Sequence, residues 1–472
     1  MNSGGAIGRN EAVAAANPLL SGPILPTLIR FALPNMAAML AGSLAAIAET
    51  AYVGRLGVPA LAGMAIVFPI IMLQMMLSGG AMGGGVSSAV ARALGSGDRA
   101  RANALVGHTL IIGIVAGLTI ATLVLGFGAP LFRTLGGKGE ALDQAIAFAS
   151  VAFLGSVGVW LVNLLAAALR GAGNMGVPSA TLFAMAALQI VIGGVLGLGL
   201  GPFPRLGMPG IAAGQVISTA LGTAILIAYL LSGRASVQLV WRGFRPKRAL
   251  FADILKVGAA AAVSPLQSIL TILLLNRFVA SFGATALAGF GIGTRFEFLL
   301  TPIAFAVGVA AVPLVGSAIG AGMIARARHA AWTAAKVGAA GLGALGIILA
   351  LVPTLWAHMF TDDPDTLATA ALYFRFAGPA YAFFGVGMCL FFSSMAAGKV
   401  LGVVLAGTVR LVVVAVGGFL LIANGAPLWA FFALITCGMV AYGAATAVAV
   451  YLTPWGPKGD STRAASAATS RP

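Results

Sequence analysis

The sequence has 472 residues, of which 60% are hydrophobic and only 8% are charged, and its mean hydropathy is +1.04. A soluble protein would carry roughly 25% charged residues, so the composition excludes an ordinary soluble globular protein. The net charge of +16 comes from Lys and Arg spread over many short segments. This spread excludes a nucleic-acid partner and is typical of loops that flank membrane spans.

Apolar runs, separated by polar, Gly or Pro residues, predict twelve membrane-spanning helices. The runs have the length that a helix needs to cross a bilayer and lack the alternation of a membrane β-barrel. Their expected limits are 26–50, 60–90, 104–128, 144–169, 177–200, 210–232, 255–281, 286–318, 332–356, 367–393, 400–423 and 428–452. The fold class that we expect is therefore all-α and integral to the membrane, with the lipid bilayer as a partner.

The loops between these runs differ in charge. Alternate loops hold most of the basic residues, whereas the opposite set holds few and includes the acidic stretch at residues 362–365. Because Lys and Arg keep loops on the cytoplasmic side, the asymmetry predicts that both termini are cytoplasmic. An even number of spans agrees with that prediction.

The two halves of the sequence repeat each other at nearly one offset. Residues 57–63 return as 283–289, an offset of 226; residues 93–102 match 318–327, and residues 170–174 match 395–399, both at an offset of 225. Since each half has six spans, both halves enter the membrane from the same side, and the repeat is parallel.

This repeat sets the expected domain limits. They are an N-terminal cytoplasmic tail (1–24), a six-helix bundle (25–232), a basic cytoplasmic linker (233–254), a second six-helix bundle (255–452) and a C-terminal cytoplasmic tail (453–472).

Four segments, in this order, resemble the multidrug and toxic compound extrusion (MATE) family. They are Glu49-Thr-Ala-Tyr-Val-Gly-Arg-Leu-Gly, Ala93-Leu-Gly-Ser-Gly-Asp, Leu169-Arg-Gly-Ala-Gly-Asn and Gly201-Pro-Phe-Pro-Arg-Leu-Gly-Met-Pro-Gly. The resemblance extends from about residue 25 to 452. It implies two MATE-like six-helix bundles facing a central cavity, and a transporter rather than an enzyme.

The function that this resemblance implies is secondary active antiport. We expect a monomer in a bacterial inner membrane that exports amphipathic, cationic organic compounds or drugs in exchange for H⁺ or Na⁺, with no cofactor besides the coupling ion. Two alternatives remain. A lipid-linked oligosaccharide flippase needs a cationic cavity, for which Arg295, Arg375 and Arg410 are candidates. A membrane enzyme would use residues 362–365 to hold magnesium, although a loop turn explains them better.

Glu49 is the leading candidate for cation coupling. A carboxylate inside a span costs about 3 kcal/mol even on permissive scales, so such a residue usually has a function. Family members commonly have an Asp here, as part of a cation site. The resemblance places Gln189 and Asn163 beside it, although Asn163 could equally form an interhelical hydrogen bond. A glutamate solvated near the outer surface, or paired with Arg55, is the alternative for Glu49.

The second half offers Arg295 and Glu297, two opposite charges within one apolar run. At a spacing of two residues they do not share a helix face, so each needs another partner. We expect a role in substrate recognition or coupling, with a structural ion pair as the alternative. Gln74, Gln215 and Gln267 are further polar residues within spans, and we expect these three and Tyr52, just after the first span, to line the substrate cavity.

Overall fold

The computed structural model describes residues 18–240 and 243–456, and all regular secondary structure in these ranges is helical. Within these ranges, eleven helical segments are long and apolar enough to cross a membrane, and the pair α7–α8, bent by 48°, supplies a twelfth. The expected all-α architecture of twelve spans is therefore confirmed. Most helices extend past the expected apolar limits, because their charged ends remain helical beyond the apolar run.

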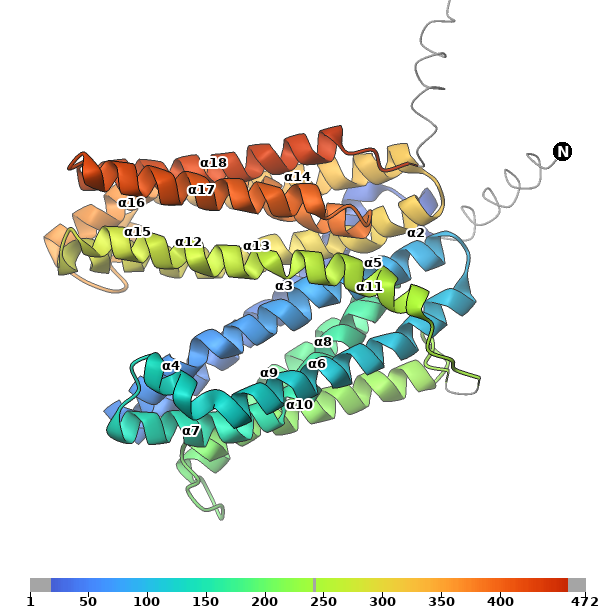
Figure 1. Cartoon of the computed structure of the whole chain (residues 1–472), viewed down its shortest axis with the longest axis horizontal. Helices are drawn as coiled ribbons and strands as arrows, with labels where there is room; N and C mark the ends of the chain where they lie inside the picture. Colours follow the sequence, from blue (N-terminus) through green and yellow to red (C-terminus); the bar gives the residue numbers. More distant parts are fainter. Residues whose placement is uncertain (1–17, 241–242, 457–472) are drawn as a thin grey trace, which may run out of the picture. The chain divides into compact units, whose positions relative to one another are not determined.

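The helices follow the chain in the order shown in Figure 1. They are α2 (Pro18–Ser21), α3 (Ile24–Leu56), α4 (Val58–Met75), η1 (Met76–Met82), α5 (Gly83–Gly95), α6 (Arg99–Thr134), α7 (Gly139–Leu154), α8 (Ser156–Gly171), α9 (Gly176–Leu198), α10 (Met208–Leu231), α11 (Arg248–Ala261), α12 (Val263–Ala280), α13 (Ala284–Gly320), α14 (Ile324–Leu351), α15 (Thr354–Ala357), α16 (Pro364–Ala396), α17 (Leu401–Ala423) and α18 (Leu428–Leu452).

The described residues form two compact units. Unit 1 comprises residues 18–32, 95–97 and 259–456, and unit 2 comprises residues 33–94, 98–240 and 243–258. The unit boundaries fall inside two helices, since α3 passes from unit 1 to unit 2 at Leu33 and α11 belongs to unit 2 as far as Gly258. Each sequence half therefore contributes the start of its leading helix to the other unit.

Small residues let the helices of unit 1 approach closely. Gly346 of α14 and Gly378 of α16 lie so near each other that a Cβ atom on either would meet the carbonyl oxygen of the other. Gly338 and Gly385 form a second such crossing between the same helices. Close backbone approach through small residues is how membrane helices gain packing energy where lipid removes the hydrophobic driving force.

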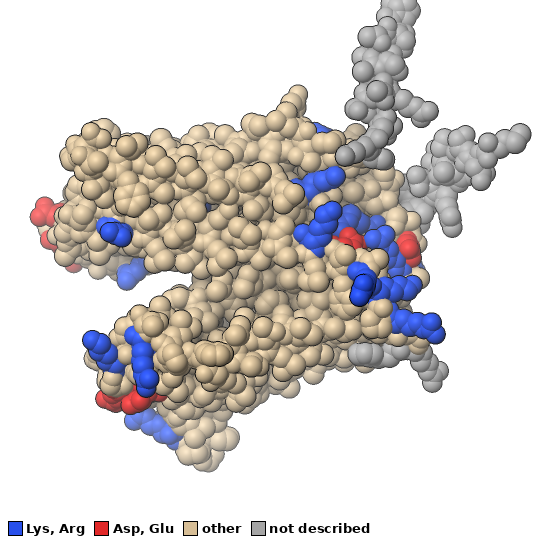
Figure 2. All heavy atoms as spheres, in the orientation of Figure 1, with Lys and Arg blue, Asp and Glu red and all other residues tan. Residues whose placement is uncertain are grey.

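The surface of each unit agrees with a membrane setting. On the face drawn in Figure 2, charged side chains lie toward the ends of the helices and the surface between them is uncharged. Large apolar side chains are exposed in both units, among them Leu44, Phe127 and Phe183 in unit 2 and Leu405 and Phe419 in unit 1. Lipid is the solvent that suits such side chains.

The second span of the first half contains a π-helix, η1, at Met76–Met82. This span holds 38 residues from Val58 to Gly95, whereas its counterpart α13 holds 37. A π-turn holds one more residue than the α-turn that it replaces. The repeat offset falls from 226 to 225 along this span because the first half has one additional residue there, and the π-helix accommodates that residue.

Candidate functional site

Glu49 lies on the face of α3 that packs against α9. Ala41, Ala45 and Glu49 follow one another at intervals of four residues, which places them along one side of the helix. Ala41 and Ala45 pack with Ala186 and Ile190 of α9. The small alanine side chains bring the two helices together, and Glu49 continues the same contact one turn further along.

The Glu49 carboxylate is buried and only partly satisfied. The residue is 9% exposed, and its Oε2 atom accepts a long hydrogen bond of 3.4 Å from Nε2 of Gln189. Its Oε1 atom is buried and has no hydrogen-bond partner among the described residues. A buried oxygen left in this state requires an explanation, and uptake of a proton or a cation provides one. Glu49 is therefore neither solvated nor paired with Arg55 in this structure.

Tyr52 belongs to the same contact between α3 and α9. A Cβ atom on Gly194 of α9 would collide with the ring of Tyr52, so the ring lies directly against the α9 backbone. Tyr52 lies about one turn from Glu49 on α3, and Gly194 lies five residues beyond Gln189 on α9. The structure thus brings Glu49, Gln189 and Tyr52 to one interface within unit 2.

Asn163 belongs to a separate polar cluster beside the π-helix. Its Nδ2 atom donates to Oγ of Ser78 at 3.0 Å, and Ser78 donates to the main-chain carbonyl of Gln74 at 2.8 Å. The side-chain Oε1 of Gln74 accepts from Oγ of Ser156 at 3.2 Å. The hydrogen bonds of Asn163 within the described chain thus go to this cluster rather than to Glu49, as the interhelical alternative expected.

Gln215 and Gln267 lie in different units. Gln215 is half-buried on α10, next to Gly214, which packs against the α9 backbone at Gly193 and Gln189. Gln267 of α12 donates through Nε2 to Oγ1 of Thr408 on α17 at 2.8 Å. Its Oε1 atom is buried without a hydrogen-bond partner among the described residues. Gln267 therefore joins α12 to α17 inside unit 1.

Glu297 of α13 lies in an aromatic environment in unit 1. It accepts a hydrogen bond from the hydroxyl of Tyr373 on α16, and Tyr381 lies beside both side chains. Arg410 of α17 attracts Glu297 electrostatically. Glu297 is conspicuous in the sequence as a charge in an apolar run, but its tyrosine partners are not, because residues on α13 and α16 come together only through the fold.

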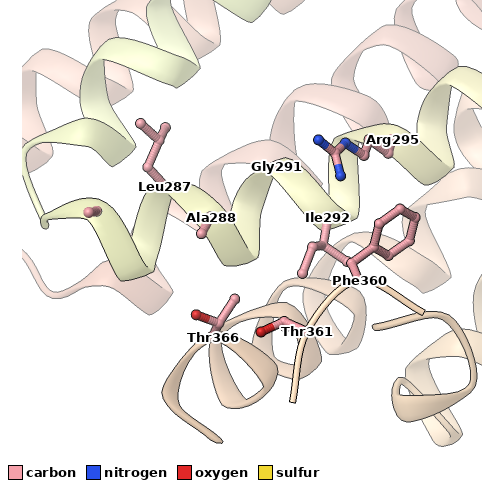
Figure 3. Close-up of a pocket in the computed structure, with 9 residues that line it drawn as sticks. Leu287, Ala288, Gly291, Ile292, Arg295, Phe360, Thr361 and Thr366 are labelled. Atoms are coloured by element: carbon pink, nitrogen blue, oxygen red, sulfur yellow. The ribbon is translucent and has the colours of Figure 1, made fainter. Parts of the chain in front are cut away.

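Arg295 lies in different surroundings from Glu297. Its guanidinium carbon is 5.2 Å from the ring centroid of Phe360, and the side chain is exposed. Figure 3 shows Arg295 at a pocket of about 560 Å³ between α13 and the segment that follows α15. The lining residues are Ala284, Leu287, Ala288, Gly291, Ile292, Arg295, Phe360, Thr361 and Thr366. Arg295 and Glu297, two residues apart in the sequence, therefore have different neighbours in the structure.

Comparison with known proteins relates the whole architecture to transporters. A family model described as MatE matches residues 34–195 and 260–420. The FAD transporter of Shewanella oneidensis is 26% identical over 373 residues, which cover 78% of this chain and 81% of that protein. The probable multidrug resistance protein NorM of Thermotoga maritima is 28% identical over 357 residues, covering 74% and 75%. The multidrug export protein MepA of Staphylococcus aureus is 26% identical over 274 residues, covering 58% and 60%.

Solved structures share the fold. An outward-facing multidrug resistance transporter of the MATE family superposes with a TM-score of 0.83 at 24% identity, covering 96% of this chain and 98% of that one. A MOP superfamily transporter from Pyrococcus furiosus gives a TM-score of 0.84 at 24% identity, covering 92% and 96%. The family model matches one long segment in each sequence half, and those halves supply the twelve spans and the buried carboxylate described above. This chain belongs to the MatE family, the MATE transporters.

Proposed function

We propose that this protein is a secondary active antiporter that exports amphipathic, cationic organic compounds in exchange for H⁺, with Na⁺ as the alternative coupling ion. The observation that carries the proposal is the buried Glu49 carboxylate, with one oxygen held by Gln189 and the other without a partner among the described residues. The multidrug names of the NorM and MepA relatives support the substrate class. We place the protein in a bacterial inner membrane, as a monomer with both termini cytoplasmic.

The chemistry follows from competition at one carboxylate. In its ionised form Glu49 attracts an organic cation, and in its protonated form it does not. Protonation lowers the affinity of the site for the organic cation. By linkage, binding of the cation lowers the affinity of Glu49 for the proton by the same factor. If the site faces the two sides of the membrane in turn, this competition converts a proton gradient into export. Glu49 and Gln189 supply few oxygen ligands, which favours H⁺ over a desolvated Na⁺.

Transport by purified protein in liposomes tests this proposal. Uptake of a fluorescent organic cation such as ethidium is measured while a proton gradient and a sodium gradient are imposed separately. The proton gradient should drive transport by the native protein. Glu49→Gln should abolish this transport without reducing the amount of folded protein, because the amide is isosteric but cannot exchange a proton. Normal gradient-driven transport by Glu49→Gln would refute the role of Glu49.

A second candidate function is export of an anionic substrate, and the arginines of unit 1 favour it. Arg295 and Arg410 lie on apolar helices, and neither forms a salt bridge with a described residue. The FAD transporter relative has an anionic substrate by its name. A lipid-linked oligosaccharide carries a pyrophosphate, so the flippase alternative shares this chemistry. Liposome uptake of FAD, compared with rescue of a flippase-deficient strain, distinguishes the two anionic substrates.

A further inference from the structure

Arg410 lies near the middle of α17, with its guanidinium beside two neighbouring aromatic rings whose centroids are 6.3 Å apart. Its Cζ atom is 6.0 Å from the ring centroid of Phe384 on α16 and 6.0 Å from that of Tyr442 on α18. With a rise of 1.5 Å per residue, Arg410 is roughly 14 Å from the first residue of its helix. A guanidinium at that depth in a bilayer is costly unless its charge is compensated.

The described residues compensate this charge only in part. Glu297 attracts Arg410 electrostatically, but Arg410 makes no salt bridge and no side-chain hydrogen bond with residues 18–240 or 243–456. The Glu297 carboxylate accepts its hydrogen bond from the hydroxyl of Tyr373. Contacts with the faces of Phe384 and Tyr442 hold the guanidinium by cation–π attraction and leave its five N–H donors available.

The helix packing that the two sequence halves share does not require the guanidinium of Arg410. The helices α9 and α17 both have 23 residues and begin 225 positions apart, which makes Met185 the counterpart of Arg410. Met185 is buried and packs against Gly222 of α10, just as Arg410 packs against Tyr442 of α18. The first half thus builds the same helix contact from apolar residues. The arginine and its aromatic neighbours are an addition of the second half.

We infer that Arg410, Phe384 and Tyr442 form a binding site for the carboxylate or phosphate of an aromatic anion. A guanidinium forms two parallel hydrogen bonds to either group, and the aromatic side chains beside it give the ring of the substrate an apolar contact. Glu297 is the negative group that interacts with Arg410 in this structure, and a bound anion would compete with it for that interaction. This inference rests on the second candidate function and gives that function its anion-binding residue.

A matched pair of probes isolates the anionic group. Riboflavin and flavin mononucleotide share one ring system, and only the second carries a phosphate. Their binding to purified protein in lipid nanodiscs is measured by flavin fluorescence polarisation. The native protein should bind flavin mononucleotide at least roughly tenfold more tightly than riboflavin, as expected for a charge-assisted hydrogen bond. Arg410→Gln should remove that difference, and Glu297→Gln should increase it.

Two controls separate this result from a structural effect. Arg277→Gln removes an exposed arginine of α12 in the same unit and should leave the difference unchanged. Arg410→Lys keeps the charge but loses the guanidinium fork, so it should retain part of the preference. Equal binding of the two flavins by the native protein would overturn the inference, as would equal losses for both flavins in Arg410→Gln. Because no gradient is imposed, failure of coupled transport at Glu49 would leave this measurement unaffected.

Discussion

Arg101 and Arg326 occupy equivalent positions, 225 residues apart, and each holds the leading segment of the other sequence half. Arg101, near the start of α6, pairs with Asp253 of α11 at 2.7 Å, and Arg92 pairs with the other oxygen of Asp253 at 2.7 Å. Arg326, near the start of α14, donates to the carbonyl oxygens of Leu19 and Gly22 ahead of α3. Two equivalent arginines thus hold α11 and the residues just ahead of α3, and each of these two helices belongs partly to both units.

Asp253→Asn tests this fastening. The change leaves Arg92 and Arg101 without the carboxylate that they share, and we expect a loss of about 1–3 kcal/mol in unfolding free energy. Hydrogen exchange of the α11 amides should become faster as well, because α11 is held to α5 and α6 at this point. Asp143→Asn, which changes an exposed carboxylate of α7, is the matched control. If both variants exchange α11 amides at the native rate, the pair does not hold the helix.

The spans and the repeat could be predicted from the sequence because both depend on local composition. Burial of Glu49 beside Gln189 was also within reach, since each is a polar residue in an apolar run. The hydrogen bond from Tyr373 to Glu297 could not be predicted, because it joins helices that are far apart in the chain. Asp253 was placed in a basic linker, and nothing local to it indicates that Arg92 and Arg101 converge on it.

The π-helix was visible in the sequence only as a difference of one between two repeat offsets. That difference places an additional residue somewhere between positions 57 and 93, but it does not say where. The structure places it at Met76–Met82, where Gly79 and Gly80 give the backbone room and Ser78 meets Asn163. Hydrogen-bond registers are a property of the folded helix, so the sequence alone could not locate it.

Deletion of Gly79 tests the origin of the π-helix. We expect the shortened span to become a continuous α-helix like α13 and the protein to remain folded, because α4 and α5 keep their own registers on either side. Transport should fall, since the bond between Asn163 and Ser78 depends on the local geometry. Size-exclusion profile, thermal unfolding and liposome transport are measured together. Deletion of Ala304 from the regular helix α13 is the control and should cause misfolding. Equal misfolding of both variants would contradict the insertion account.

Asp363 gives a pH-dependent prediction outside the spans. It caps α16, accepting hydrogen bonds from the hydroxyl and from the backbone N–H of Thr366, and these bonds hold the pKa of its carboxyl below the usual value. A depressed pKa means that the stabilisation is full above the unfolded-state pKa and is lost as the pH falls through the folded-state pKa. The native protein should therefore unfold at a higher temperature than Asp363→Ala near neutral pH.

That difference in unfolding temperature should shrink as the pH is lowered into the acidic range. Thermal unfolding of the detergent-solubilised protein, followed over a pH series, provides the measurement. Asp363→Asn should lie between the native protein and the alanine variant, because an asparagine side chain also caps a helix. Its stability should not follow the same titration. A constant difference between the native protein and Asp363→Ala at every pH would show that the carboxylate does not form the cap.

The exchange of a small cation for cargo at Glu49 is the central claim, and cation release measures it most directly. Purified protein in weakly buffered detergent solution is mixed with an organic cation that it transports, and the released protons are counted with a pH indicator, with radioactive sodium displacement as a parallel assay. We expect proton release from the native protein, none from Glu49→Gln, and nearly native release from Glu140→Gln, which makes the same change at an exposed glutamate of α7. Undiminished release from Glu49→Gln would contradict the account.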